Sequence, residues 1–199
     1  MRLLSGLAIG LILLAGHGDA QARLTKADGD RFQTKLGRIV ATGNAPRGRA
    51  RAAQSTVISD AEVNSYLRFH AQEQIPVGVV DPAINAHGDG VVSGSAIVDL
   101  DAVRKQKQRG WLDPMGYLTG RLPLTARGRL TAKDGIGRFH FESAELSGVT
   151  IPKTLLQELL SYYSSTPENP KGINMDDPFE LPALIREIRV ARGAATIVQ

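Results

Sequence analysis

The segment 118–132 alternates apolar or small residues with polar ones along its whole length. The apolar set is Leu118, Gly120, Leu122, Leu124, Ala126, Gly128, Leu130 and Ala132. Side chains of a strand point alternately to opposite faces, so this pattern predicts one extended strand with a single apolar face. Such a strand exceeds the usual length of about 5–6 residues and does not fit a small compact sandwich. Its apolar face has no aromatic residue, which favours a long curved sheet with space against that face.

The N-terminal residues 1–22 have the pattern of a secretory signal peptide. Arg2 precedes the apolar run 7–15, and Ala20-Gln21-Ala22 has the small-residue form that signal peptidase cleaves. The run is shorter than the roughly 20 residues that span a bilayer. We therefore expect export and cleavage after Ala22, and an uncleaved N-terminal anchor flanked by Arg23 is the alternative. The chain has no cysteine, so neither a lipid-modified cysteine nor a disulfide is expected.

Composition is that of one globular domain. Removing residues 1–22 from the 199 leaves 177 residues, which fits one domain. The hydrophobic fraction is 42% but only 5% is aromatic, so an aliphatic core is expected. We divide the chain into the signal peptide 1–22, an N-terminal helix and flexible basic linker at 23–54, and a main domain at 55–199.

The formal net charge of +4 reflects two basic clusters, at 31–51 and 104–109. A cluster of this kind either forms an ordinary solvated face or attracts an anionic membrane surface, an attraction that salt screens. Nucleic acid is not expected as a partner, because the chain carries an export signal and lacks interleaved basic and aromatic residues.

In the first half of the main domain, the sequence predicts one helix followed by two strands. Ser59 and Glu62 have capping-box spacing and begin a helix. Strands are expected at 79–87 and 91–100, joined by the turn 88–90, and Pro82 restricts the first of them to a sheet edge or a bulge. A short helix is expected at 102–109.

The second half continues an antiparallel meander and adds a covering helix. The long strand is followed by a turn at 133–135 and a strand at 138–146. Pro152 suits the first turn of a helix that extends to Ser164. Leucines recur on it at helical spacing, at Leu155, Leu156, Leu159 and Leu160. A loop at 166–178 and a C-terminal hairpin around Gly193 complete an α+β fold.

Together these features resemble a known superfamily. Within 55–198 the chain is similar to bacterial exported proteins of the tubular lipid-binding (TULIP-like, BPI-like) fold. The similarity is carried by five segments: ISDAEVNSYL, GDGVVSGSAIVDLDAV, GYLTGRLPLTARGRL, FESAELSGVTIPKTLLQELL and IREIRVARGAATIV. That group includes a periplasmic lipoprotein family and mycobacterial phospholipid-binding envelope proteins. The resemblance implies a half-barrel in which a long, curved antiparallel sheet wraps around one or two amphipathic helices and leaves a groove for acyl chains. The chain departs from the lipoproteins by lacking the lipobox cysteine, which implies a soluble periplasmic form.

We expect this groove to be lined by Leu67, Val98, Leu118, Leu122, Leu124, Ala126, Leu130, Leu156 and Leu160. Small residues on the inner face of the sheet, such as Gly120 and Gly128, favour a groove because they leave volume beneath a helix that a lipid tail fills. The alternative is that the leucines are ordinary core residues and the glycines permit sheet coiling and close helix approach. Arg121, Arg127 and Arg129 are candidates for contact with an anionic headgroup.

Catalytic patterns are weak. His70, His87 and His140 lie on separate elements without the spacing of a zinc site. Ser93-Gly94-Ser95 lies in a strand and lacks the elbow of a hydrolase nucleophile, and Asp176-Asp177 is more typical of a turn than of a calcium site. Glu142 and Glu145 are expected on opposite faces of a strand, which separates them as an acid and base pair.

The sequence therefore predicts a non-enzymatic protein without a cofactor. We expect it to bind a lipid or other amphiphile in an elongated apolar groove, in lipid transport or maintenance of the cell envelope. A ligand-free envelope scaffold or assembly factor is the alternative, and a hydrolase is the remote third class.

Overall fold

The computed structural model describes residues 23–45, 53–102, 119–167 and 169–199, apart from the side chains at 159, 162 and 163. In these residues the fold is α+β, with an open antiparallel sheet of nine strands. The predicted signal peptide, most of the helix expected at 102–109, and Leu118 lie outside them. So do the centre of the expected basic linker and the side chains of Leu159 and Tyr163.

The centre of the sheet is the predicted meander. It contains β2 (Val79–Gly88), β3 (Val91–Asp99), β4 (Arg121–Lys133) and β5 (Ile136–Leu146), each antiparallel to the next. The two hairpin turns use residues that tolerate positive φ: Asp89 (52°) with Gly90 (80°), and Asp134 (54°) with Gly135 (82°). Both predicted turns are confirmed.

The long strand begins later than predicted. β4 is 13 residues long, starts at Arg121 and keeps the expected alternation, with the polar residues more exposed than their apolar neighbours. Gly120 has a φ of 84°, in the left-handed region that regular strands do not use, so the chain turns there before the strand begins. The expectation that Gly120 lies on the inner strand face is wrong.

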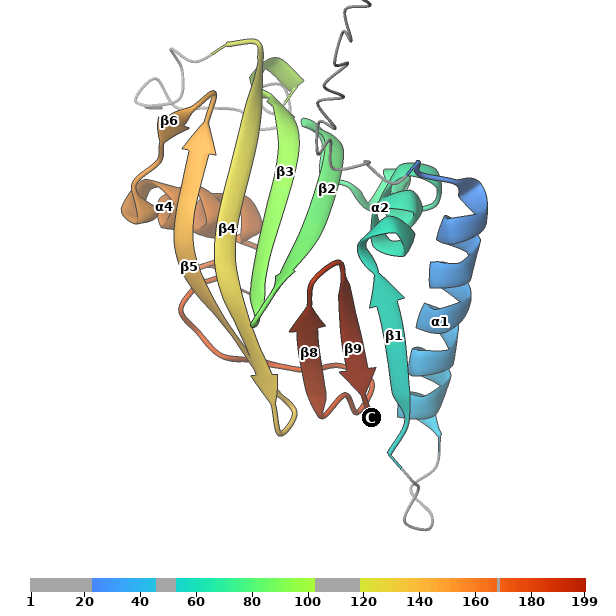
Figure 1. Ribbon diagram of the computed structural model, residues 1–199. Coiled ribbons are helices and arrows are strands. Elements are labelled where there is room, and N and C mark those ends of the chain that lie inside the picture. Colours follow the sequence, from blue (N-terminus) through green and yellow to red (C-terminus); the bar gives the residue numbers. More distant parts are fainter. Residues whose placement is uncertain (1–22, 46–52, 103–118, 168) are drawn as a thin grey trace, which may run out of the picture.

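The other half of the sheet is built by β1 (Ser55–Ser59), β8 (Glu187–Ala191) and β9 (Ala194–Val198). Strand β8 joins the far end of β4 where Ala132 pairs with Ile188, so β4 links the two halves (Figure 1). The short strands β6 (Val149–Thr150) and β7 (Phe179–Glu180) pair with the two ends of β5. The predicted C-terminal hairpin is confirmed.

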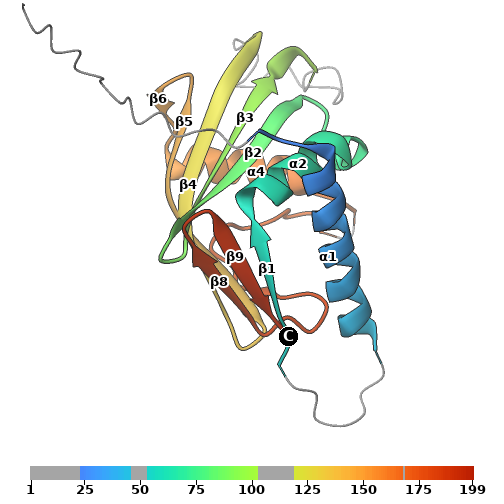
Figure 2. The ribbon, with the colours of Figure 1, turned by 45° about the vertical axis from the view of Figure 1, so that its right-hand side comes forward.

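Helices lie against one face and one edge of this sheet. Helix α4 (Lys153–Ser164) crosses one face of the meander, and α2 (Asp60–Phe69) with the short 3₁₀ helix η1 (Gln72–Gln74) lies beside β2 (Figure 2). Helix α1 (Lys26–Asn44) packs on α2 and β1, and it continues into the start of the expected linker.

A closed core fills the half of the molecule that contains β8 and β9. It consists of Ile39, Ala132, Leu181, Ile185 and Ile197, with Ile58, Leu130, Ala183 and Ile188 packed against it. Leu130, expected to line the groove, therefore contributes to this core. This buried aliphatic core lies at the C-terminal end of β4, whereas the half-buried residues Leu122, Leu124 and Ala126 lie toward its other end.

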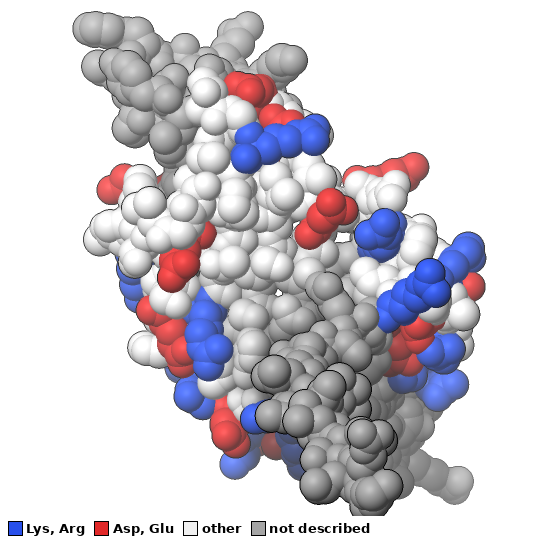
Figure 3. Space-filling model, turned by 45° about the horizontal axis from the view of Figure 1, so that its top comes forward, with Lys and Arg blue, Asp and Glu red and all other residues white. Residues whose placement is uncertain are grey.

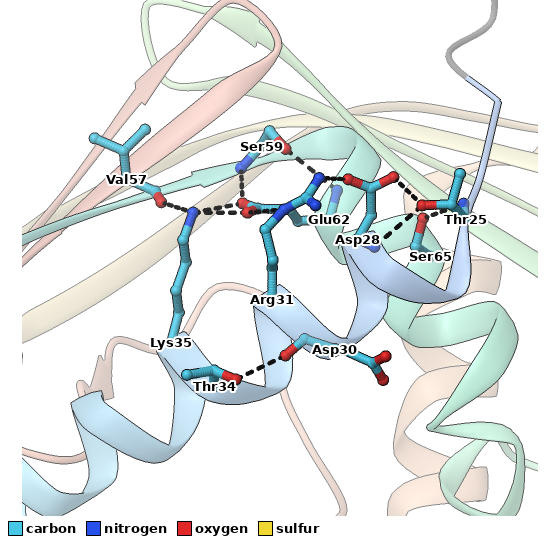
Figure 4. Close-up of polar contacts among 10 residues, drawn as sticks. All are labelled: Thr25, Asp28, Asp30, Arg31, Thr34, Lys35, Val57, Ser59, Glu62 and Ser65. Atoms are coloured by element: carbon cyan, nitrogen blue, oxygen red, sulfur yellow. Dashed lines mark hydrogen bonds and ion pairs between the residues drawn. The ribbon is translucent and has the colours of Figure 1, made fainter.

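The predicted capping box is confirmed and also attaches α2 to α1. The Ser59 side chain accepts a hydrogen bond from the Glu62 amide, and the Glu62 carboxylate accepts one from the Ser59 amide. Lys35 of α1 donates to both Glu62 oxygens, at 2.7 and 2.8 Å, and to the Val57 carbonyl at 2.7 Å (Figure 4). Burial would raise the pKa of Glu62, but the hydrogen bonds from Lys35 and Ser59 outweigh it and hold the pKa below its ordinary value.

A bulge in β5 corrects one expectation about carboxylates. The register advances by one residue at Glu142, because Arg127 pairs with Ser143 whereas Gly128 pairs with Phe141. Glu142 therefore lies on the same face as Arg127, with which it forms an ion pair, and Glu145 is on that face too, opposite Thr125. The prediction that Glu142 and Glu145 lie on opposite faces is wrong, since a bulge reverses the alternation.

Candidate ligand-binding site

The apolar face of the meander consists of rows of residues in register across neighbouring strands. One row joins Ile84, Gly94, Ala126 and Ala144, and the next rows join Ala96 with Leu124 and Val98 with Leu122. Directly paired residues of antiparallel strands share a face. Four predicted groove residues, Val98, Leu122, Leu124 and Ala126, thus lie on one continuous surface, which we call the concave face.

Helix α4 covers this face only in part. Ala144 is 1% exposed, whereas its neighbours Ser143 and Glu145 on the other face are exposed, so α4 packs on the side of Ala144. Away from β5 the concave face is half-buried, and Ile84 on β2 is 43% exposed. Leu156 and Leu160 of α4 are half-buried as well. An apolar surface with small side chains at its centre therefore remains accessible.

Two glycines of this face differ in what lies above them. Among the described residues, a Cβ built on Gly94 meets only the Ala83 carbonyl oxygen, at 3.8 Å, which is an ordinary contact. A Cβ on Gly128 would come within 2.3 Å of the Phe139 ring. The prediction that Gly128 leaves free volume is therefore wrong, because Phe139 occupies it, whereas no described side chain occupies the space above Gly94.

The arginines proposed to meet a headgroup lie on the opposite, polar face. Arg127 and Arg129 approach Glu142 at 3.2 and 3.8 Å, and Arg121 pairs with Asp99 at 3.0 Å. The Ala102 amide and the Arg121 guanidinium hold the pKa of Asp99 below its ordinary value. These arginines lie on the face away from the apolar rows and approach carboxylates of their own sheet, so their assignment to a groove mouth is wrong.

A pocket of about 440 Å³ lies between α2, η1 and β2. Its walls are largely apolar, from Leu24, Leu67, Ile75, Val77, Val79 and Val80, and its polar residues are Asn64, Arg68, Gln72 and Asp81. The predicted groove residue Leu67 lies here. Val79 pairs with Val98, which pairs with Leu122, so the pocket adjoins the concave face through this row. Its volume is within the range of small-molecule sites, about 300–1,000 Å³.

Sequence reasoning missed most of this pocket. Pro82 indicated an edge strand or a bulge, and the structure shows both: β2 is the last strand of the sheet path, and its register shifts between Val80 and Ala83. That signal marked the irregular backbone but gave no sign that Arg68 and Asp81 would line a common pocket.

The histidines and paired acids occupy separate positions. His70 is half-buried, with Nε2 2.8 Å from an Asp30 oxygen and its ring stacked on Tyr66, while His87 Nε2 lies 2.7 Å from the Ser93 hydroxyl. Asp176 accepts from Lys153 at 2.6 and 2.8 Å. Within the described ranges, no group of three or more metal-ligating side chains comes together.

No family model matches the chain, and no curated protein matches it. Among solved structures, the crystal structure of lipopolysaccharide binding protein aligns at 16% identity with a TM-score of 0.23. The alignment covers 78% of this chain and 45% of that protein, so the chain spans less than half of its length. A likeness of this size carries no argument about fold or function.

No described helix is both long enough and apolar enough to cross a bilayer. On the face shown in Figure 3, acidic and basic side chains are interspersed, and a broad area between them carries no charge. Among the described residues drawn on this face, the two signs of charge are therefore mixed.

Proposed function

We propose that this protein is a non-enzymatic, exported binding protein that holds the tail of a lipid or similar amphiphile on the concave face between the meander and α4. The observation that carries the proposal is the half-buried state of this face around Gly94 and Ala126. A sheet face that is apolar and has small central residues normally packs to full density. Here the closed core lies at the other end of the molecule, and the space beside Gly94 is left for a tail.

The energetics of this arrangement favour an aliphatic ligand. Each methylene transferred from water contributes about 0.8 kcal/mol, and the described residues paired around Gly94, namely Ile84, Ala126 and Ala144, offer aliphatic contacts. The TULIP-like half-barrel, the periplasmic location and a role in envelope lipid transport or maintenance are parts of this proposal that derive from the sequence resemblance. The proposal also includes contact of the protein with an anionic membrane surface.

The experiment compares a groove-filling variant with a matched control in the purified, delipidated protein. Gly94→Leu places a side chain where, among the described residues, the Cβ meets one atom at ordinary distance. We expect affinity for monopalmitoyl glycerol to fall by about tenfold or more, while stability without ligand changes by less than about 0.5 kcal/mol or rises. Ser95→Val, one residue along on the polar face, should leave affinity unchanged. Ala126→Phe should act like Gly94→Leu.

One observation favours the alternative of a protein-binding scaffold. Val57 is 55% exposed on β1, the strand at the other end of the sheet path, and Val40 of the adjacent α1 is 44% exposed. Free strand edges bind extended partners. If the wild-type protein binds no palmitoyl lipid and Gly94→Leu is clearly destabilised, the concave face is a packed surface and the scaffold function replaces lipid binding.

A further inference from the structure

The pocket between α2, η1 and β2 contains one cation and one anion that are not paired with each other. Arg68 and Asp81 both line it. In the described part of the chain, neither forms an ion pair, and the Arg68 guanidinium lies 5.9 Å from the centroid of the neighbouring Phe69 ring. A mostly apolar pocket that is lined by two opposite charges without an ion pair between them forms a binding site of mixed polarity.

Charges beside the meander are arranged differently. Arg121 pairs with Asp99, and Arg127 and Arg129 approach Glu142. Pairing with a neighbour thus occupies these three arginines. Arg68 and Asp81 are exposed and form no such pair among the described residues, so their hydrogen-bonding capacity is open to solvent or to a ligand.

The backbone holds Asp81 in an unusual conformation at the pocket wall. Its φ is 47°, although a residue before proline is normally extended. The bulge between Val80 and Ala83 produces this conformation, and Asn64 fixes the strand just beyond it by two hydrogen bonds to Ile84. The backbone position of Asp81 in the pocket wall is therefore set by β2 and α2 together.

The remaining walls determine what kind of molecule fits. Leu67, Ile75 and Val79 are apolar, and Val79 leads through Val98 to the concave face. A free zwitterion would leave these apolar walls unused, whereas an amphiphile whose tail lies on the concave face brings its polar end to the pocket.

We infer that the pocket receives the headgroup of a zwitterionic amphiphile, with its ammonium group at Asp81 and its phosphate or carboxylate group at Arg68. The inference rests on the proposed function, because it assigns the polar end of the same ligand. Arg68 is suited to the anionic group because a guanidinium donates two parallel hydrogen bonds to its oxygens.

Three palmitoyl probes below their micelle-forming concentrations test the inference at pH 7: lysophosphatidylethanolamine (zwitterionic), lysophosphatidic acid (anionic) and monopalmitoyl glycerol (neutral). A fourth probe, phosphoethanolamine alone, tests the headgroup without its tail. We expect the zwitterionic lipid to bind about tenfold more tightly than the other two lipids, and phosphoethanolamine to bind most weakly. Arg68→Gln and Asp81→Asn should each remove that advantage without changing affinity for the neutral lipid. The controls Arg38→Gln and Glu73→Gln alter exposed residues outside the pocket walls and should retain it.

The other outcomes separate this inference from the proposed function. Equal affinity for all three lipids would overturn the headgroup site and leave lipid binding in place. Tightest binding of the anionic lipid, strengthened by Asp81→Asn, would also overturn it, because Asp81 would then only repel. Tight binding of phosphoethanolamine alone would make the ligand a free metabolite and not an amphiphile. If none of the probes binds, the proposed function fails together with the inference.

Discussion

The side chain of Asn64 on α2 forms hydrogen bonds with both the amide and the carbonyl of Ile84 on the outer strand β2. Its Nδ2 donates to the Ile84 carbonyl and its Oδ1 accepts from the Ile84 amide, each at 2.8 Å. One turn earlier, Asp60 accepts from the Ala86 amide at 2.9 Å. The helix thus satisfies the strand edge as a neighbouring strand would, and prevents another chain from pairing there.

Removal of this contact should loosen the edge that forms the pocket. Asn64 is 9% exposed, so Asn64→Ala leaves two partly buried backbone groups of Ile84 without this partner and should cost about 1–3 kcal/mol. Urea unfolding measures the loss. The exposed Asn85 on β2 provides the control, because Asn85→Ala should change stability by less than about 0.5 kcal/mol. Equal effects of the two substitutions would contradict the edge role of Asn64.

The two inner-face glycines should respond in opposite ways to the same substitution. Gly128→Ala forces a methyl group against the Phe139 ring and should destabilise the protein by about 1–3 kcal/mol. Of the described atoms, the methyl group of Gly94→Ala meets only the Ala83 carbonyl oxygen, at 3.8 Å, so this variant should be neutral or slightly stabilising. Thermal unfolding of both variants is the measurement. A destabilised Gly94→Ala together with a neutral Gly128→Ala would mean that the open space lies at the other glycine.

Docking of α1 on α2 should weaken in acid because of Glu62. Its pKa in the folded protein is below the ordinary value of 4.5, so ionised Glu62 stabilises the fold fully above that value. The contribution is lost as the pH falls below 4.5 and through the folded pKa. Glu62→Gln should cost about 1.5–3 kcal/mol at pH 7 and reduce the fall in stability below pH 4.5.

Urea unfolding of wild type and Glu62→Gln across this pH range tests the assignment. Glu73→Gln, an exposed change on η1, should keep the wild-type pH dependence. Identical pH profiles for wild type and Glu62→Gln would show that another carboxylate controls the acid response.

Export remains a prediction from the N-terminal sequence. Cleavage after Ala22 should give a mature protein that begins at Arg23 and is released by osmotic shock. N-terminal sequencing of protein from its native host checks this. Membrane-bound protein that retains Met1 would instead support the uncleaved anchor.

The sequence by itself determined the local elements of this protein. The alternation in β4, the turns at Asp89-Gly90 and Asp134-Gly135, and the capping box at Ser59 and Glu62 were all predicted correctly. Each depends on backbone preferences or on a side-chain period within a few residues, which neighbours in the chain are sufficient to specify.

Only the tertiary structure decided what covers the apolar surfaces. The packing of Phe139 on Gly128, the packing of Leu130 against the closed core and the reversal of alternation at Glu142 depend on partners distant in sequence. The pocket that brings Arg68 near the bulge at Asp81 depends on how α2 docks on the edge of β2. Periodicity identifies the apolar face of an element but not what packs against it, because that choice belongs to the whole fold.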